Sequence, residues 1–128
     1  MGLGKNSPVA FIPTTKAKQA RAFYEKTLRL PFESADDFAI VFRAGIEGVM
    51  LRVTIVPELT PQEFTIFGWQ VDDIAASVTD LTAKGVEFTR YGFMKQDKQG
   101  IWNAPGGTKV AWFKDPDGNT LSLSQHPK

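Results

Sequence analysis

Residues 113–125 read FKDPDGNTLSLSQ, and this stretch predicts a β-hairpin close to the C-terminus. Phe113 ends one strand, the DPDGN segment at 115–119 forms a tight turn, and residues 120–124 run back as a second strand. Asp, Pro, Gly and Asn each favour turns for steric or hydrogen-bonding reasons. We therefore interpret Asp115 and Asp117 as turn residues rather than as a catalytic pair of carboxylates.

The composition is typical of a soluble globular domain. Of the 128 residues, 42% are hydrophobic and 23% are charged, and the net charge is +1. Lys and Arg form no basic patch, the apolar runs are far shorter than a membrane span, and the first residues lack the apolar core of a signal peptide. We expect a cytoplasmic protein with one domain, residues 1–128, and no nucleic-acid or membrane partner.

Hydrophobic periodicity predicts alternating strands and helices. In the first half we expect a strand at 8–13, a helix at 16–28, and strands at 30–34, 38–42 and 49–56. In the second half we expect a strand at 64–71, then a helix that Asp72 or Asp73 caps and Gly85 ends. Four further strands follow, at 86–91, 101–103, 109–113 and 120–124.

The two halves have the same order of elements. Val9 in the first strand and Ile66 in its counterpart are 57 residues apart (66 − 9), as are the helix starts at Lys16 and Asp73 (73 − 16). An equal spacing of this kind indicates an internal repeat. We expect two βαβββ units, at about 8–56 and 63–125, with a linker at about 57–62. Chance alternation in an α+β domain is the alternative.

Three segments carry a family resemblance. ARAFYEKTLRLPF (20–32), GWQVDDIAASVTDLTAKGVEF (68–88) and VAWFKDPDGNTLSL (110–123) resemble, in this order, segments of the vicinal oxygen chelate superfamily, which includes glyoxalase I, bleomycin-resistance proteins and extradiol dioxygenases. The resemblance implies an α+β fold in which two βαβββ modules form a curled mixed sheet around a cavity. One departure is Arg29, where the family usually has Gly; we expect Arg29 to follow the helix without a left-handed conformation.

The resemblance also implies where metal ligands would lie. The four family positions fall on Val9, on Met50 or Leu51, on Ile66 and on Ser122, and none of these is His, Asp or Glu. Divalent metals require imidazole, carboxylate or thiolate ligands. His126 is the only histidine of the sequence and there is no cysteine. We therefore expect no metal and no other cofactor.

Strand alternation predicts which side chains face the cavity instead. If Ser122 faces inward, Thr120 and Ser124 do so too, while Trp69 packs on the helix side. Tyr91 and Phe93 either form a lid or pack on the surface. The predicted ligand-binding residues are Phe11, Met50, Arg52, Ile66, Gln70, Trp102, Trp112 and Ser122.

These residues favour metal-independent binding of a small aromatic or amphipathic molecule, in the manner of bleomycin-resistance proteins. The alternative is a glyoxalase- or dioxygenase-like enzyme, a lyase, isomerase or oxygenase that uses Arg52, Tyr91 or Glu47, or a metal enzyme with ligands elsewhere. A partner-binding domain with a collapsed cavity is a third possibility. The resemblance also implies a homodimer, for which VAFIP (9–13) and EFTIF (63–67) are the candidate interface segments.

Overall fold

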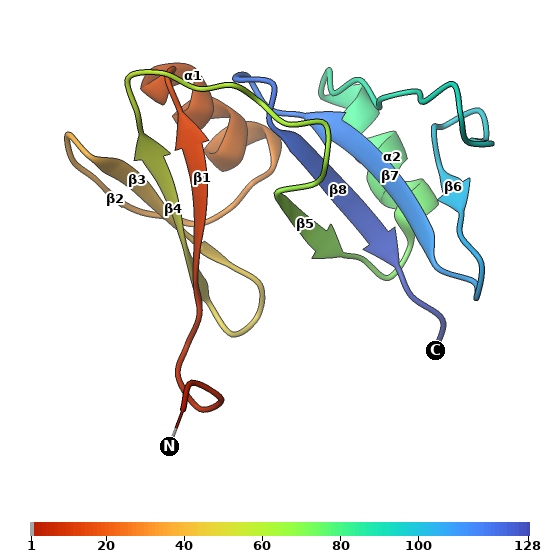
Figure 1. Cartoon of the computed structure of the whole chain (residues 1–128), viewed down its shortest axis with the longest axis horizontal. Helices are drawn as coiled ribbons and strands as arrows, with labels where there is room; N and C mark the ends of the chain where they lie inside the picture. Colours follow the sequence, from red (N-terminus) through yellow and green to blue (C-terminus); the bar gives the residue numbers. More distant parts are fainter. Residues whose placement is uncertain (1) are drawn as a thin grey trace. The chain divides into compact units, whose positions relative to one another are not determined.

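The computed structural model describes residues 2–128. The chain divides into two compact units, one ending at Thr60 and the other spanning Pro61–Lys128, which we call the N-terminal and the C-terminal unit. Each unit contains one four-stranded sheet, with a helix along one of its faces (Figure 1). Within residues 2–128, none of the helices has the length and apolar character needed to cross a bilayer.

The N-terminal unit begins with β1 (Val9–Thr14), followed by α1 (Ala17–Ala22), which continues as the π-helical turn η1 (Phe23–Thr27). The remaining strands are β2 (Phe32–Ala35), β3 (Ala39–Ala44) and β4 (Val49–Ile55). The sheet order is β1-β4-β3-β2, with β1 parallel to β4 and the other pairs antiparallel.

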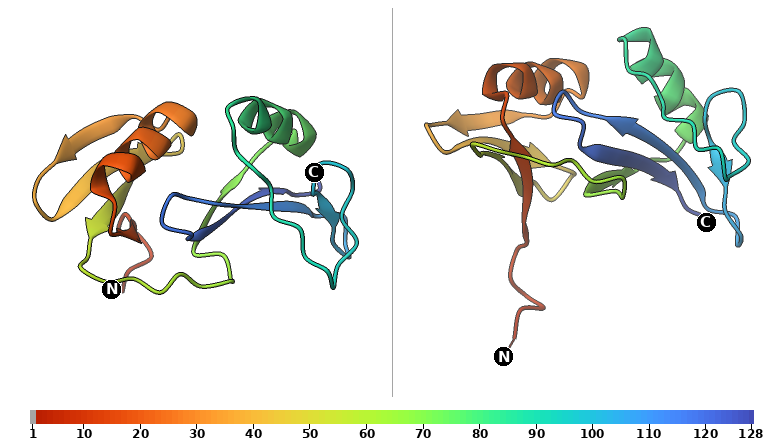
Figure 2. Two further views of the ribbon diagram at one scale, coloured as in Figure 1. Left: turned by 90° about the horizontal axis from the view of Figure 1, so that it is seen from above. Right: turned by 45° about the horizontal axis from the view of Figure 1, so that its top comes forward.

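The C-terminal unit repeats this plan. Its elements are β5 (Phe67–Gln70), α2 (Ile74–Ala83), β6 (Trp102–Asn103), β7 (Lys109–Lys114) and β8 (Thr120–Gln125). The sheet order is β5-β8-β7-β6, again with only the first pair parallel, and α2 lies along one face of the sheet (Figure 2). Two sheets with corresponding strand orders confirm the predicted α+β fold of two βαβββ units.

Each sheet has a helix face and a helix-free face. In the N-terminal unit, Ile12, Phe42, Leu51 and Val53 are buried on the helix face, where Phe42 contacts Tyr24 of the helix. In the C-terminal unit, the buried residues of α2 are Ile74, Val78 and Leu81. They lie over the buried residues of β7 and β8, which are Ala111, Phe113, Leu121 and Leu123. Both sets are apolar, as the periodicity predicts. The intervening residues of each strand therefore point to the helix-free face.

Two predicted strands are wrong in extent. Residues 86–91 form no strand. Phe88 alone among them forms a β-bridge, to Phe113 of β7. The strand that pairs with this edge of β7 is β6. The strand predicted at 64–71 begins only at Phe67. Ile66 lies before it, although its N–H donates a hydrogen bond to the Thr120 carbonyl oxygen at 3.0 Å.

The predicted helix ends are confirmed for α2. Asp73 is the N-cap, and its side chain accepts a hydrogen bond from the Ala76 N–H at 3.1 Å. At the other end Gly85 has φ +94°, and the N–H groups of Gly85 and Val86 donate to the carbonyls of Thr82 and Leu81. This is the Schellman arrangement that glycine favours.

The prediction for Arg29 is wrong, because Arg29 adopts the left-handed conformation with φ 61°. The π-helical turn has added a residue to the helix end, so that the Leu30 N–H donates to the Tyr24 carbonyl, six residues back. Closing this wider turn requires a positive φ at Arg29, where the Cβ atom of a non-glycine residue is strained.

Replacing Arg29 with glycine should therefore stabilise the protein. We expect the free energy of unfolding to rise by about 0.5–1 kcal/mol, since the removal of Cβ strain exceeds the added entropy of the unfolded chain. Thermal unfolding monitored by circular dichroism measures the change. Arg29→Ala is the control: it removes the same charged side chain but keeps the Cβ atom, and an equal gain in that variant would contradict the argument.

Candidate functional site

Four aromatic side chains gather in the C-terminal unit, and we call them the aromatic cluster: Tyr91, Phe93, Trp102 and Trp112. The ring of Trp112 lies 6.1 Å from that of Trp102 and 5.4 Å from that of Tyr91, and Tyr91 lies 5.6 Å from Phe93. Trp102 pairs in register with Val110, so it shares the helix-free face with Trp112. Trp102 and Trp112 are only half-buried and Phe93 is 82% exposed, so aromatic surface remains available there for a ligand.

The loop that carries Tyr91 and Phe93, residues 89–101, is held by internal hydrogen bonds. The Gln96 side chain accepts from the Tyr91 N–H at 2.7 Å and donates to the carbonyls of Thr89 and Gly100 at 2.9 and 2.8 Å. The Asp97 carboxylate accepts from the N–H groups of Gln99 and Ile101. Both N–H donors of the Gln96 amide are therefore used within the loop, and these bonds favour a pre-formed aromatic surface over a mobile lid.

The hydroxyl group of Tyr91 is a free donor inside this cluster. Its oxygen is buried and has no hydrogen-bond partner among residues 2–128. Burial raises the pKa of Tyr91, and the Glu63 carboxylate adds to the shift. The hydroxyl therefore stays protonated at neutral pH and cannot serve as a base, and it can donate to a ligand only if a neighbouring side chain moves aside to uncover its oxygen.

The helix-free face of the N-terminal unit carries a second set of predicted residues. Phe11 pairs in register with Arg52, and Val9 with Met50, so these four side chains lie on one face of β1 and β4. Phe11 is 60% exposed, whereas Met50 and Arg52 are half-buried. Leu51 is fully buried on the helix face, whereas Met50, the other residue considered for the family ligand position, lies on the helix-free face.

Of the other predicted residues, Ser122 and Gln70 lie on the helix-free face of the C-terminal unit. Ser122 pairs in register with Trp112 and with Gly68, and its hydroxyl occupies the space that a Cβ atom on Gly68 would need. Gln70 is exposed at the end of β5. The unit thus brings Trp102, Trp112, Ser122 and Gln70 onto one face.

The expectations for Thr120 and Trp69 have different outcomes. Thr120 does not line an accessible surface, because it is fully buried. Its hydroxyl donates to the carbonyl of Gln62 at 2.8 Å, so the segment before β5 covers this end of β8. Trp69 lies on the helix side as predicted, with its ring stacked on Phe113 at 6.4 Å and 20°.

The side chains at the family's metal positions do not fit a metal ion. Val9, Met50, Ile66 and Ser122 offer no imidazole, carboxylate or thiolate. Elsewhere in residues 2–128, no three His, Cys, Asp or Glu side chains come close enough together to hold one. The site can offer stacking, a phenol donor and hydroxyl groups, but not Lewis-acid chemistry from this ligand set.

Sequence reasoning considered Tyr91 as a lid, surface or catalytic residue, but it did not predict the contact of Tyr91 with Trp112, and it did not single out Gln96. It placed Tyr91 in a strand, whereas the Gln96 amide holds it in a loop against Trp112. A loop glutamine with three backbone partners has no signature in the sequence, since each partner is defined only by the folded loop.

Comparison with known proteins gives one family. The model of the Glyoxalase/Bleomycin resistance protein/Dioxygenase superfamily matches residues 8–123. Comparison with the curated proteins gave no significant match.

Solved structures share the fold at low sequence identity. A bleomycin resistance determinant encoded on the transposon Tn5 is 22% identical with a TM-score of 0.74, over 97% of this chain and 100% of that chain. A superfamily member from Sphaerobacter thermophilus is 20% identical with a TM-score of 0.75, over 98% and 100%. A lactoylglutathione lyase from Agrobacterium tumefaciens is 15% identical with a TM-score of 0.71, over 95% of each chain.

The matched segment covers both βαβββ units, and the structural matches span nearly the whole chain. The chain therefore belongs to the Glyoxalase/Bleomycin resistance protein/Dioxygenase superfamily.

Proposed function

We propose that the protein binds a small aromatic or amphipathic molecule without the help of a metal ion. The observation that carries this proposal is the aromatic cluster, in which Trp102 and Trp112 lie side by side on the helix-free face of the C-terminal unit. Indole rings stack on flat ligands through dispersion and hydrophobic burial, and neither requires a Lewis acid. A structure of similar fold, 22% identical, is a bleomycin-binding protein complexed with bleomycin.

Other predicted residues of the C-terminal unit complete the proposed lining. Ser122 and Gln70 supply polar groups beside the aromatic cluster, and Ile66 supplies an apolar contact just before β5. Such a mixture of apolar surface with a few polar groups is typical of small-molecule sites. On the helix-free face of the N-terminal unit, Phe11, Met50 and Arg52 offer an aromatic ring, a flexible apolar chain and a cation, which we propose as a separate contact surface.

Trp112 should contribute most to binding. In Trp112→Ala, a flat aromatic ligand should bind about tenfold more weakly or worse, because stacking contributes roughly 0.5–1.5 kcal/mol and the buried area is lost as well. Isothermal titration calorimetry against bleomycin, a flavin and a set of phenols measures this, since it does not depend on the indole that is removed. If the variant binds every hit as tightly as the parent, the site lies elsewhere.

Three matched variants sharpen the test. Trp69→Phe should leave affinity unchanged, since Trp69 stacks on Phe113 on the helix side. Tyr91→Phe should weaken only ligands that carry a hydrogen-bond acceptor, because it removes the free hydroxyl and keeps the ring. Arg52→Ala tests the surface of the N-terminal unit separately, and it should weaken only anionic ligands that bind there.

The competing proposal is an enzyme of the glyoxalase or dioxygenase type with atypical residues. The protonated state of Tyr91 disfavours it as a base, and Glu47 lies exposed in the turn between β3 and β4. Turnover of the hemithioacetal of methylglyoxal and glutathione by the purified protein would favour the enzyme over the binding protein.

We also propose a cytoplasmic homodimer. β1 and β5 are edge strands of their sheets, and Val9, Phe11 and Phe64 in or beside the candidate interface segments are exposed. Unpaired edges with apolar side chains favour pairing with a second chain. Light scattering should give the dimer mass at micromolar concentration; a monomer mass there would contradict this.

A further inference from the structure

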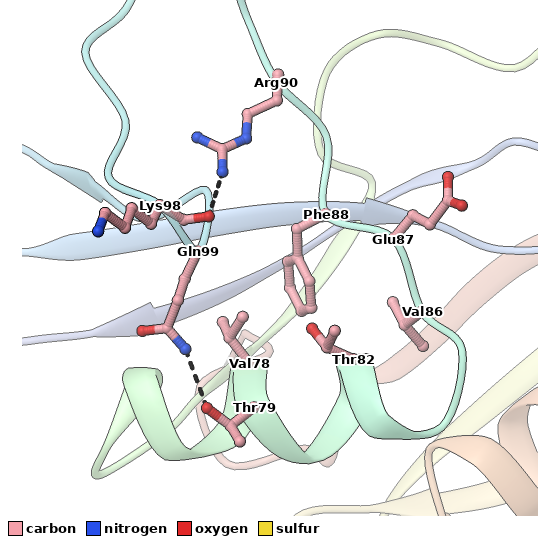
Figure 3. A pocket seen from close by; sticks show the side chains of 9 residues that line it. All are labelled: Val78, Thr79, Thr82, Val86, Glu87, Phe88, Arg90, Lys98 and Gln99. Carbon is pink, nitrogen blue, oxygen red and sulfur yellow. Dashed lines mark hydrogen bonds between the residues drawn. The ribbon is translucent and has the colours of Figure 1, made fainter.

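A pocket of about 530 Å³ lies between α2 and the segment that follows it, away from the aromatic cluster (Figure 3). Its floor is apolar and consists of Val78 on the helix with Val86 and Phe88 on the segment after it. Val78 and Val86 are almost fully buried, while the Phe88 ring is half-buried. Thr79 and Thr82 line the helix side of the pocket, so the wall that α2 forms is polar.

The loop side of the pocket is cationic. Arg90 lines the pocket, and its guanidinium group donates to the backbone carbonyls of Asp97 and Lys98, of which Figure 3 shows the contact with Lys98. These two contacts fix the planar group and leave further N–H donors, since a guanidinium carries five. Among residues 2–128, neither Arg90 nor Lys98 forms an ion pair.

The two walls of the pocket are joined by one side chain. The Gln99 amide nitrogen donates to the Thr79 hydroxyl at 3.0 Å and to the Ala75 carbonyl at 3.1 Å. This bridge holds the 89–101 loop against α2 at one end of the pocket. Glu87 is the one carboxylate of the lining, and it points away from the Phe88 ring in Figure 3. The lining therefore contains two cationic residues and one anionic residue, and in Figure 3 the side chain of Lys98, like that of Glu87, points away from the Phe88 ring.

We propose that this pocket is a second binding site, for a small amphipathic anion such as a medium-chain carboxylate. The alkyl chain lies on Val78, Val86 and Phe88, and the carboxylate accepts hydrogen bonds from Arg90. A fixed guanidinium beside an apolar floor is complementary to a molecule with one charged end and one apolar end. The proposal is independent of the function assigned to the aromatic cluster.

Octanoate is the probe, and backbone amide NMR of the full chain is the measurement. We expect saturable shifts, with a millimolar Kd, at residues 78–82, 86–90 and 98–99. Thr82→Trp should abolish them, because an indole at this exposed helix position fills the pocket, whereas Thr82→Ala should keep them. 1-Octanol should bind at least fivefold more weakly than octanoate, because it lacks the charge.

Two charge variants separate recognition from loop bracing. Arg90→Gln should raise the Kd for octanoate at least fivefold, but it also removes the contacts to two loop carbonyls. Lys98→Gln keeps that bracing, since Arg90 contacts only the Lys98 backbone, and it should raise the Kd about twofold. Lys95→Gln, which alters a loop lysine outside the pocket lining, should leave the Kd unchanged.

Three results would overturn the proposal. Octanoate shifts confined to Trp102 and Trp112 would place the anion on the aromatic cluster. Equal affinity for octanol and octanoate would show that the cations play no part. Shifts at the same amides on raising the protein concentration alone, with octanoate absent, would identify this face as a contact between copies of the chain.

Discussion

Replacing Asp115 with alanine should lower the free energy of unfolding by about 3–5 kcal/mol, since each buried donor left without an acceptor costs about 1–3 kcal/mol. Asp115 is only 6% exposed. One carboxylate oxygen accepts from the N–H groups of Asp117 and Asn119 at 3.0 and 2.9 Å, and the other accepts from the Asn119 side-chain amide at 2.9 Å. Asn119 is itself 99% buried, so water cannot replace the lost acceptor.

Urea denaturation measures this change, and the same turn supplies the control. Asp117→Ala alters a half-buried carboxylate two residues away and should cost less than Asp115→Ala, because it leaves the buried Asn119 donors with their acceptor. Asp115→Asn keeps one acceptor oxygen and should fall between the two. If Asp115→Ala and Asp117→Ala cost the same, the hydrogen bonds of Asp115 do not stabilise the hairpin.

This contrast also shows how far the hairpin could be read from sequence. The DPDGN composition was sufficient to identify a turn, and Asp115 and Asp117 look alike in the sequence. Their burial differs only in the folded protein, where Pro61 packs against Gly118 and partly covers the turn. A Cβ atom on Gly118 would lie 3.3 Å from the Pro61 ring, and φ is +89° there, which explains the glycine.

The sheet faces were predictable because strand alternation is strict. One buried residue per strand, such as Leu51 or Phe113, determines the direction of its neighbours, so Met50, Arg52 and Trp112 point to the helix-free faces. Alternation fails where the backbone leaves the sheet. Tyr91 was therefore missed as a partner of Trp112, since the loop that carries it is held by side-chain hydrogen bonds rather than by a strand.

Helix ends were predictable only where the residue type matches the backbone conformation. Gly85 and Asp73 do so, and both caps are confirmed. Arg29 does not, because it follows a π-helical turn that the residue types do not indicate; this turn carries the buried Tyr24, whose ring lies against Phe42. The positive φ of Arg29 is destabilising, and nothing in the residue type at this position predicts it.

The second large effect is expected at the aromatic centre of each unit. Phe113 is fully buried between Phe88 and Trp69, at ring distances of 5.5 and 6.4 Å, and Phe42 is fully buried between Tyr24 and Phe32, at 6.0 and 6.1 Å. Phe113→Ala and Phe42→Ala should each lower the free energy of unfolding by about 3–5 kcal/mol, through lost burial and the cavity left behind. The exposed Phe38 and Phe93 are the matched controls, and alanine at either should cost about 0.5 kcal/mol or less.

These two variants also test whether the units unfold together. We predict one domain, so each substitution should shift a single transition, seen alike by tryptophan fluorescence and by far-ultraviolet circular dichroism. All three tryptophans lie in the C-terminal unit, so fluorescence follows that unit while circular dichroism follows both. If Phe42→Ala shifts the circular dichroism transition but leaves the fluorescence midpoint where it was, the N-terminal unit unfolds by itself. The two βαβββ units would then be separate folding domains, and the one-domain prediction would be wrong.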